Sequence, residues 1–88
     1  MRSIEYTIHD ENGIHARPAG IIVSAAKKFC SDITLEIVGK EKIADAKKLF
    51  AVMGMGVGKG DVVKITAKGD DAAEALLKLE AEMRSAGL

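Results

Sequence analysis

The stretch Gly13-Ile14-His15-Ala16-Arg17-Pro18 is followed by a run of helix-forming and apolar residues. Gly13 permits a sharp change of chain direction, and Pro18, the chain's one proline, is tolerated in a first helical turn because its missing N–H has no partner there. We therefore expect a helix to begin here, with His15 at the loop-to-helix junction. Unpaired backbone N–H groups and the positive end of the helix dipole at such a junction favour an anionic group beside His15 and Arg17.

The apolar pattern on both sides of this stretch predicts four strands and two further helices. Every second residue is apolar in three segments, 3–8, 33–37 and 62–68, as in strands buried on one face. A tight turn at Gly39-Lys40 predicts a further short strand around 42–44. Apolar residues at three- and four-residue spacing predict a short helix over roughly 46–53, capped by Asp45, and a last helix capped by Asp70 or Asp71. The last helix is expected to bury Ala73, Leu76, Leu77 and Met83.

The resulting order is strand, helix, strand, strand, helix, strand, helix. Strands that are apolar on one side only require a sheet covered on one face, with the helices on that face. The 88 residues suffice for one compact domain and not for two. We therefore expect a single α+β domain over residues 1–88.

The composition excludes several classes of partner. The 13 basic and 13 acidic residues balance, which gives no electrostatic reason to expect nucleic acid or an anionic membrane surface as the main partner. The single cysteine, Cys30, cannot form an internal disulfide, and we expect it to be a small buried filler near the end of the first helix. No segment is long and apolar enough to span a bilayer or to resemble a signal peptide. These features predict a cytoplasmic protein without membrane insertion.

A second motif, residues 52–61, completes a resemblance to a known family. Val52-Met53-Gly54-Met55-Gly56-Val57-Gly58-Lys59-Gly60-Asp61 and the motif around His15 together resemble HPr, the histidine phosphocarriers of the bacterial phosphoenolpyruvate-dependent phosphotransferase system. The likeness runs essentially end to end. It implies an open-faced β-sandwich, in which a four-stranded antiparallel sheet carries three helices on one side.

The resemblance also implies a function. Members of this family accept a phosphoryl group from phosphorylated Enzyme I on the histidine of the first motif and pass it to sugar-specific IIA domains. His15 would be the acceptor, through Nδ1, and Arg17 would stabilise the phosphoryl group. Ala16, Pro18 and Asn12 would support the site. A relay of this kind is not an enzyme, and we expect no cofactor and no metal; a carrier that offers one face to successive partners is best as a monomer.

The predicted short helix carries the expected docking surface for Enzyme I and IIA domains. Leu49, Phe50 and Met53 lie at helical spacing, and methionine suits a surface that must fit several partners. Many relatives carry a regulatory serine at the position of Lys48, which a serine kinase cannot modify. Lys48 therefore argues against the usual regulatory role and, with Lys47, would attract an acidic docking face; an ordinary solvated helix face is the alternative.

Other interpretations fit the residues less well. The glycine-rich stretch around Gly58-Lys59 is not a Walker loop, because Met53 and Gly60 occupy the positions that need Gly and Ser or Thr. His9 and His15 with the neighbouring acidic residues match no structural zinc pattern. Two alternatives stay open: a regulatory binding module with the HPr fold, and a carrier for a nitrogen-related or dihydroxyacetone-kinase branch of the system.

Overall fold

A computed structural model describes residues 1–88, and the observed elements follow the predicted order. The elements are β1 (Arg2–Thr7), α1 (Ala16–Ala26), β2 (Asp32–Ile37), β3 (Ile43–Asp45), α2 (Leu49–Met53), β4 (Val62–Lys68) and α3 (Ala72–Ser85). The α+β arrangement with three helices and four strands is therefore confirmed. None of the helices combines the length and the apolar character that crossing a bilayer requires.

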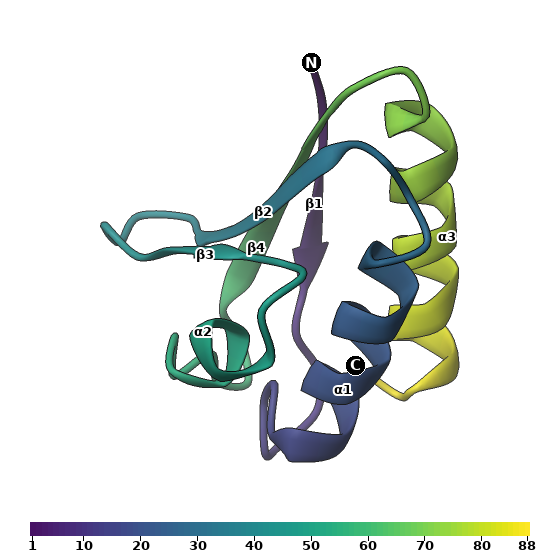
Figure 1. The fold of residues 1–88 in the computed structure, drawn as a ribbon. Coiled ribbons are helices and arrows are strands. Elements are labelled where there is room, and N and C mark those ends of the chain that lie inside the picture. Colours follow the sequence, from purple (N-terminus) through teal and green to yellow (C-terminus); the bar gives the residue numbers. More distant parts are fainter.

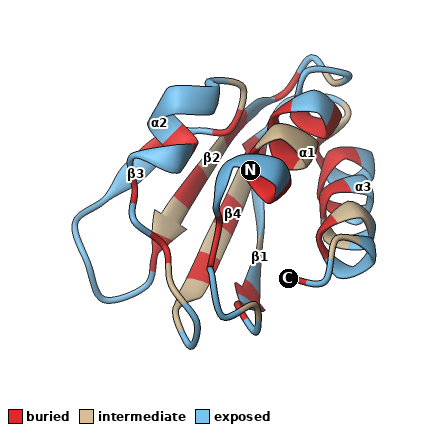
Figure 2. Ribbon diagram, turned by 90° about the horizontal axis from the view of Figure 1, so that it is seen from below, coloured by how far each residue is buried: buried red, intermediate tan, exposed pale blue.

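The four strands form one antiparallel sheet in the order β1-β4-β2-β3, and the helices gather on one side of it (Figure 1). The register explains why the other side stays polar. Glu5 lies opposite Lys64, which lies opposite Glu36, so unlike charges alternate across three neighbouring strands on the open face. The alternate residues of the same strands point to the helices and are largely buried (Figure 2).

The core is a single cluster of 25 buried apolar residues, and it is aliphatic apart from Tyr6. In α3 the buried positions are Ala72, Ala75, Leu76, Leu79 and Met83. The prediction that Ala73 and Leu77 are buried is wrong: both are exposed. Successive helical residues are about 100° apart, so a stripe set by Leu76 and Leu79 turns Leu77 toward the side of the helix.

A glycine ends α3. Gly87 has a φ of +80°, its N–H donates to Arg84 O at 3.1 Å, and the N–H of Leu88 donates to Met83 O at 3.0 Å. This pair of bonds is a Schellman motif, which satisfies two carbonyl groups at the end of the helix.

The second helix is shorter than predicted. It begins after Lys48, and Asp45 does not cap it, because Asp45 is the last residue of β3. The Asp45 carboxylate instead accepts a hydrogen bond from the N–H of Lys47 at 2.9 Å. A short polar side chain that bonds the backbone two residues on favours a turn over a helix, and this turn delays the start of α2.

The prediction for Cys30 is also wrong. Helix α1 ends at Ala26, and Cys30 follows it in a turn with its side chain exposed. Asp71 accounts for this orientation: its carboxylate accepts hydrogen bonds from the N–H groups of Cys30 (2.8 Å) and Ser31 (3.0 Å) and from the Ser31 hydroxyl. Ser31 therefore takes the buried place, and Asp71, although it is the N-cap residue of α3, makes no side-chain bond to its own helix.

Gly13 brings the loop before α1 against the glycine-rich loop that follows α2. Its φ is +63°, and a Cβ added to it would overlap the carbonyl oxygen of Val57 and come within 2.8 Å of Gly58 Cα. The same approach lets the N–H of Ile14 donate to Val57 O at 3.2 Å. No other residue type meets both conditions, so Gly13 fixes the position of the His15 segment.

The two glycines near His15 predict opposite effects of the same substitution. Gly13→Ala should lower the free energy of unfolding by more than about 2 kcal/mol, because a left-handed conformation and a backbone clash add together. Gly20→Ala should raise it by about 0.5–1 kcal/mol, because Gly20 lies inside α1 and a Cβ there would meet nothing within 4 Å. Urea unfolding of the two variants measures both effects, and a Gly13→Ala variant as stable as the unsubstituted chain would contradict the first.

The Asp71 cluster predicts a dependence of stability on pH. The hydrogen bond from the Ser31 hydroxyl, and then the one from the Cys30 N–H, hold the pKa of Asp71 below its usual value of 3.8. A carboxyl whose pKa is lower in the folded state contributes stability above its unfolded pKa and loses it as the pH falls through the folded value. Below about pH 3.8, Asp71→Asn should therefore show a shallower loss of unfolding free energy than the unsubstituted chain.

Asp70→Asn is the matched control, because Asp70 is exposed and its carboxylate accepts no hydrogen bond from the protein. The hydrogen bond from Lys78 also holds the pKa of Glu82 below its usual value. The loss of unfolding free energy that follows from protonating Glu82 is therefore the same in all the variants. Denaturant unfolding at several acidic pH values measures the slopes. Equal slopes for the Asp70 and Asp71 variants would show that the cluster does not link stability to pH.

Candidate functional site

His15 is the N-cap residue of α1, as predicted. Its backbone is extended (φ −86°, ψ −171°), and its carbonyl accepts the N–H of Ala19 at 2.9 Å. The imidazole makes no capping bond to the helix, and 42% of the side chain is exposed. The ring is therefore held at the end of the helix by the backbone while its nitrogens remain available for chemistry.

Two backbone donors beside His15 are unpaired. The N–H groups of Ala16 and Arg17 make no hydrogen bond to a protein acceptor, and Pro18, the third helical residue, has no N–H. These donors lie at the positive end of an 11-residue helix. A helix N-terminus of this kind is suited to bind phosphate or carboxylate oxygens.

Asp10 faces the ring of His15 and was not singled out from the sequence. Its Oδ1 accepts the N–H of Asn12 at 2.9 Å, and its Oδ2 lies 3.5 Å from His15 Nε2. The only signal was the turn sequence Asp10-Glu11-Asn12-Gly13, since an Asp that bonds the N–H two residues later is the usual start of such a turn. The sequence could not show that the second carboxylate oxygen would point to the imidazole.

The Asp10 carboxylate has a chemical consequence for the neutral imidazole. One nitrogen of a neutral histidine carries a proton and the other a lone pair, and a hydrogen-bond acceptor favours the proton on the nitrogen that faces it. A carboxylate beside Nε2 therefore favours the Nε2–H tautomer. In that tautomer the lone pair is on Nδ1.

The other residues predicted for the site occupy different roles. Arg17 is exposed and makes no ion pair or side-chain hydrogen bond within the protein, so its guanidinium is available to a ligand. Pro18 is buried in the first turn of α1. Asn12 is exposed, and its backbone N–H takes part in the turn by donating to Asp10, as an ordinary turn residue does. The structure places no group of three metal-ligating side chains together, at His9 or elsewhere.

Helix α2 packs against α1 and presents apolar side chains to solvent. Val52 is its one buried residue, whereas Phe50 is 83% exposed and Leu49 and Met53 are also exposed. Lys48, the N-cap residue, is exposed, and the Nζ of Lys47 donates to Phe29 O at 2.8 Å. In Figure 1, α2 and the first turn of α1 lie toward the same end of the molecule, so this apolar surface shares that end with His15.

Comparison with known proteins places the chain in a family. Residues 2–85 match the family model of the PTS HPr component phosphorylation site. The histidine-containing phosphocarrier protein of Mycoplasma superimposes with a TM-score of 0.95 at 33% identity, over 99% of this chain and 97% of that one. HPr from Thermoanaerobacter tengcongensis superimposes with a TM-score of 0.87 at 39% identity, over 97% of this chain and 93% of that one.

A relative with a different name has the same fold. Crh, the catabolite repression protein of Bacillus subtilis, superimposes with a TM-score of 0.72 at 35% identity, over 97% of this chain and 95% of that one. The match over residues 2–85 and identities above 30% across nearly the whole chain agree with the element order and with the position of His15. The chain belongs to the HPr family, the phosphocarriers of the phosphotransferase system.

Proposed function

We propose that this protein accepts a phosphoryl group from phosphorylated Enzyme I on His15 and passes it to sugar-specific IIA domains in the cytoplasm. The observation that carries the proposal is the arrangement at the start of α1, where an exposed imidazole at the N-cap lies beside two free N–H groups and has a carboxylate at Nε2. Proteins of this family carry a phosphoryl group and do not turn over a substrate. In this role the protein is transiently phosphorylated, between the transfer from Enzyme I and the transfer to a IIA domain.

The transfer step follows from this geometry. The Nδ1 lone pair of neutral His15 attacks the phosphorus atom, a P–N bond forms, and the bond to the leaving group on Enzyme I breaks with its electron pair going to that group. The proton on Nε2 stays in place and faces Asp10. The phosphoryl oxygens then accept hydrogen bonds from the N–H groups of Ala16 and Arg17, each worth roughly 1.5–3 kcal/mol when one partner is charged. The Arg17 guanidinium adds a further cation.

Docking is assigned to the exposed face of α2. Leu49, Phe50 and Met53 offer an apolar surface, and Phe50 is the most exposed of the three. Lys48 adds a positive charge at the rim, which favours an acidic partner surface. Because α2 packs against α1, a partner seated on this face reaches His15 at the same time.

A regulatory binding module is the second candidate, and the likeness to Crh favours it. Lys48 argues against the usual form of this role. It stands at the N-cap of α2, where many relatives carry the regulatory serine, and a lysine cannot take a phosphoryl group from a serine kinase. A carrier for a nitrogen-related or dihydroxyacetone-kinase branch is a variant of the first proposal. Comparison of the phosphorylation rates with the Enzyme I of each branch distinguishes the carriers.

Intact-mass spectrometry after incubation with phosphoenolpyruvate and a purified Enzyme I tests the relay. We expect one phosphoryl adduct that brief acid treatment removes, because phosphohistidine is labile to acid, and no adduct on His15→Ala. Circular dichroism melting of His15→Ala checks that the variant is folded; its exposed side chain makes no capping bond, so the melting temperature should stay close to that of the unsubstituted chain. An adduct that survives in folded His15→Ala would show that another residue is the acceptor.

Truncation of Phe50 tests the docking surface. Phe50→Ala should raise the KM for this protein in the Enzyme I reaction roughly tenfold, because an aromatic side chain at an interface often contributes more than 1 kcal/mol. The unfolding free energy should hardly change, since Phe50 is 83% exposed. Leu77→Ala is the matched control, because Leu77 is also a largely exposed apolar side chain (69%) and lies on α3. Equal KM values for the two variants would place the docking surface elsewhere.

A further inference from the structure

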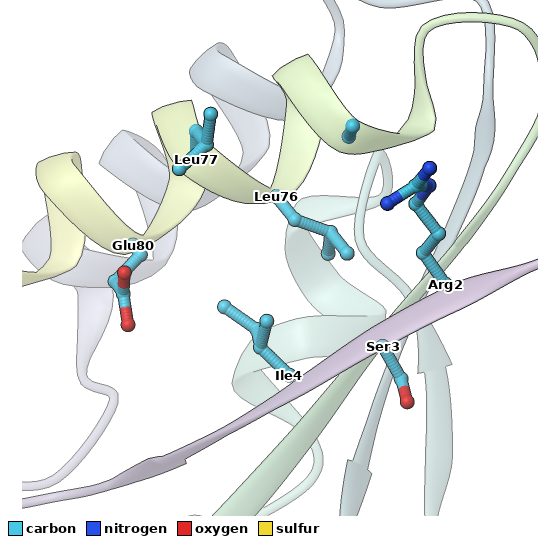
Figure 3. A pocket seen from close by; sticks show the side chains of 7 residues that line it. Arg2, Ser3, Ile4, Leu76, Leu77 and Glu80 are labelled. Atoms are coloured by element: carbon cyan, nitrogen blue, oxygen red, sulfur yellow. The ribbon is translucent and has the colours of Figure 1, made fainter.

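A groove runs between β1 and α3, away from His15. It encloses about 310 Å³ and is lined by Arg2, Ser3, Ile4, Ala73, Leu76, Leu77 and Glu80. Figure 3 shows Ile4 of the strand and Leu76 of the helix pointing toward one another in the middle, with Arg2 at one end and Glu80 at the other. The relay assigned to His15 and α2 makes no use of this groove.

The groove lies along an unpaired sheet edge. β1 is the first strand in the order β1-β4-β2-β3, so one side of its six residues has no neighbouring strand. Alternate N–H and C=O groups of an edge strand point outward and are free to pair with another chain. The opposite edge, β3, offers only three residues. β1 is therefore the longer of the two free edges, and it contains no proline.

The helix beside this edge, α3, exposes an aliphatic side chain that is not packed in the core. Leu77 is 69% exposed, lines the groove and was expected to be buried. Ile4, on the β1 side of the same groove, is partly buried against the core. Covering both side chains would remove apolar surface from water at the point where the strand edge is also unpaired.

The charges of the groove favour a second copy of the same chain as its partner. α3 runs parallel to β1, so Arg2 lies beside the first turns of the helix and Glu80 lies beyond Ile4. A two-fold axis at Ile4 sets the two β1 strands antiparallel, with Ile4 opposite its own copy. The same operation brings Arg2 of each copy to the Glu80 end of the other, so the groove is complementary to itself. Glu80 lies 3.4 Å from Arg84, and its two oxygens can accept from both guanidinium groups.

The spacing of the elements is compatible with this arrangement. Paired strands lie about 4.8 Å apart. Because α3 covers both β1 and β4, its axis lies above the midpoint between them, about 2.4 Å inward from β1. The two copies of α3 would then be about 10 Å apart, which is close to the usual 8–10 Å between packed helices. The Leu77 side chains would fill the space between the two helices.

We propose that the outer edge of β1 and the groove beneath α3 bind a second copy of this chain, forming an antiparallel two-fold dimer centred on Ile4. A six-residue strand and one helix face are small beside the roughly 1,200–2,000 Å² of stable complexes, so the dissociation constant should be on the order of 100 µM. The sequence led us to expect a monomer because one face must stay open to partners. This dimer meets that requirement, since α2 contacts α1 and β3, and β3 is the edge of the sheet opposite β1. In Figure 1, α2 also lies toward the opposite edge of the sheet from α3 along the strand order.

Sedimentation equilibrium of the full chain, from about 10 µM to about 1 mM, measures the association. We expect the mean mass to rise from 9.3 kDa toward twice that value. Leu77→Glu should weaken the dimer at least tenfold, and Arg2→Glu or Glu80→Arg should each weaken it several-fold. The double variant Arg2→Glu/Glu80→Arg should recover most of the affinity, because the two charges are exchanged together.

Ile43→Glu, on the opposite edge strand and 66% exposed, is the matched control and should leave the dimer unchanged. A chain that is monomeric at every concentration would overturn the proposal. The same result is expected if the β1 edge pairs only with a strand of a different protein. A dimer that Leu77→Glu leaves intact, or that Ile43→Glu breaks, would also overturn it. The proposal is independent of the relay: Leu77→Glu should still form the phosphoryl adduct on His15.

Discussion

The close approach of Gly13 to the carbonyl of Val57 is the constraint on which the site depends. It brings together two loops that are more than forty residues apart in the chain, and it requires both a positive φ and the absence of a side chain at one position. The N–H of Ile14 donates to the same oxygen, Val57 O. This bond fixes the segment before α1 to the loop after α2. The histidine and the apolar face of α2 therefore keep their relation without a direct bond between them.

The start of α1 is formed without a side-chain cap, which leaves its first N–H groups free. A serine, threonine or aspartate at the N-cap would bond the free N–H groups and stabilise the helix by about 1 kcal/mol. His15 occupies that position and makes no such bond. The stability of α1 comes instead from its buried face, which packs against α3 and contributes Ala19, Ile22, Val23, Ala25 and Ala26 to the core. The unsatisfied donors are thus a property of the site that the rest of the domain maintains.

Most of the fold could be predicted from the sequence, because alternation in the strands and three- and four-residue spacing in the helices depend on the chain's own periodicity. The parts that could not be predicted depend on contacts between distant segments. Asp71 has the sequence signature of a helix cap, but its carboxylate bonds the turn at Cys30 and Ser31, some forty residues away. The side of Leu77 depends on how α3 rotates against the sheet. At the site, the position of His15 was predictable from Pro18, whereas the contact of Asp10 with Nε2 depends on the conformation of the loop.

Pro18 has a further effect on the chemistry of the site. A carrier must hold its phosphoryl group firmly enough to exclude hydrolysis and loosely enough to release it to the next protein, so the strength of the contacts has an upper as well as a lower limit. The first three residues of an ordinary helix supply three free N–H groups, but with proline third, Ala16 and Arg17 supply only two. At roughly 1.5–3 kcal/mol for each charge-assisted bond, a third donor would shift the transfer equilibrium by about one to two orders of magnitude toward the phosphorylated carrier. In the proposed relay, the proline that fixes the start of the helix therefore also limits how tightly the helix can hold the phosphoryl group.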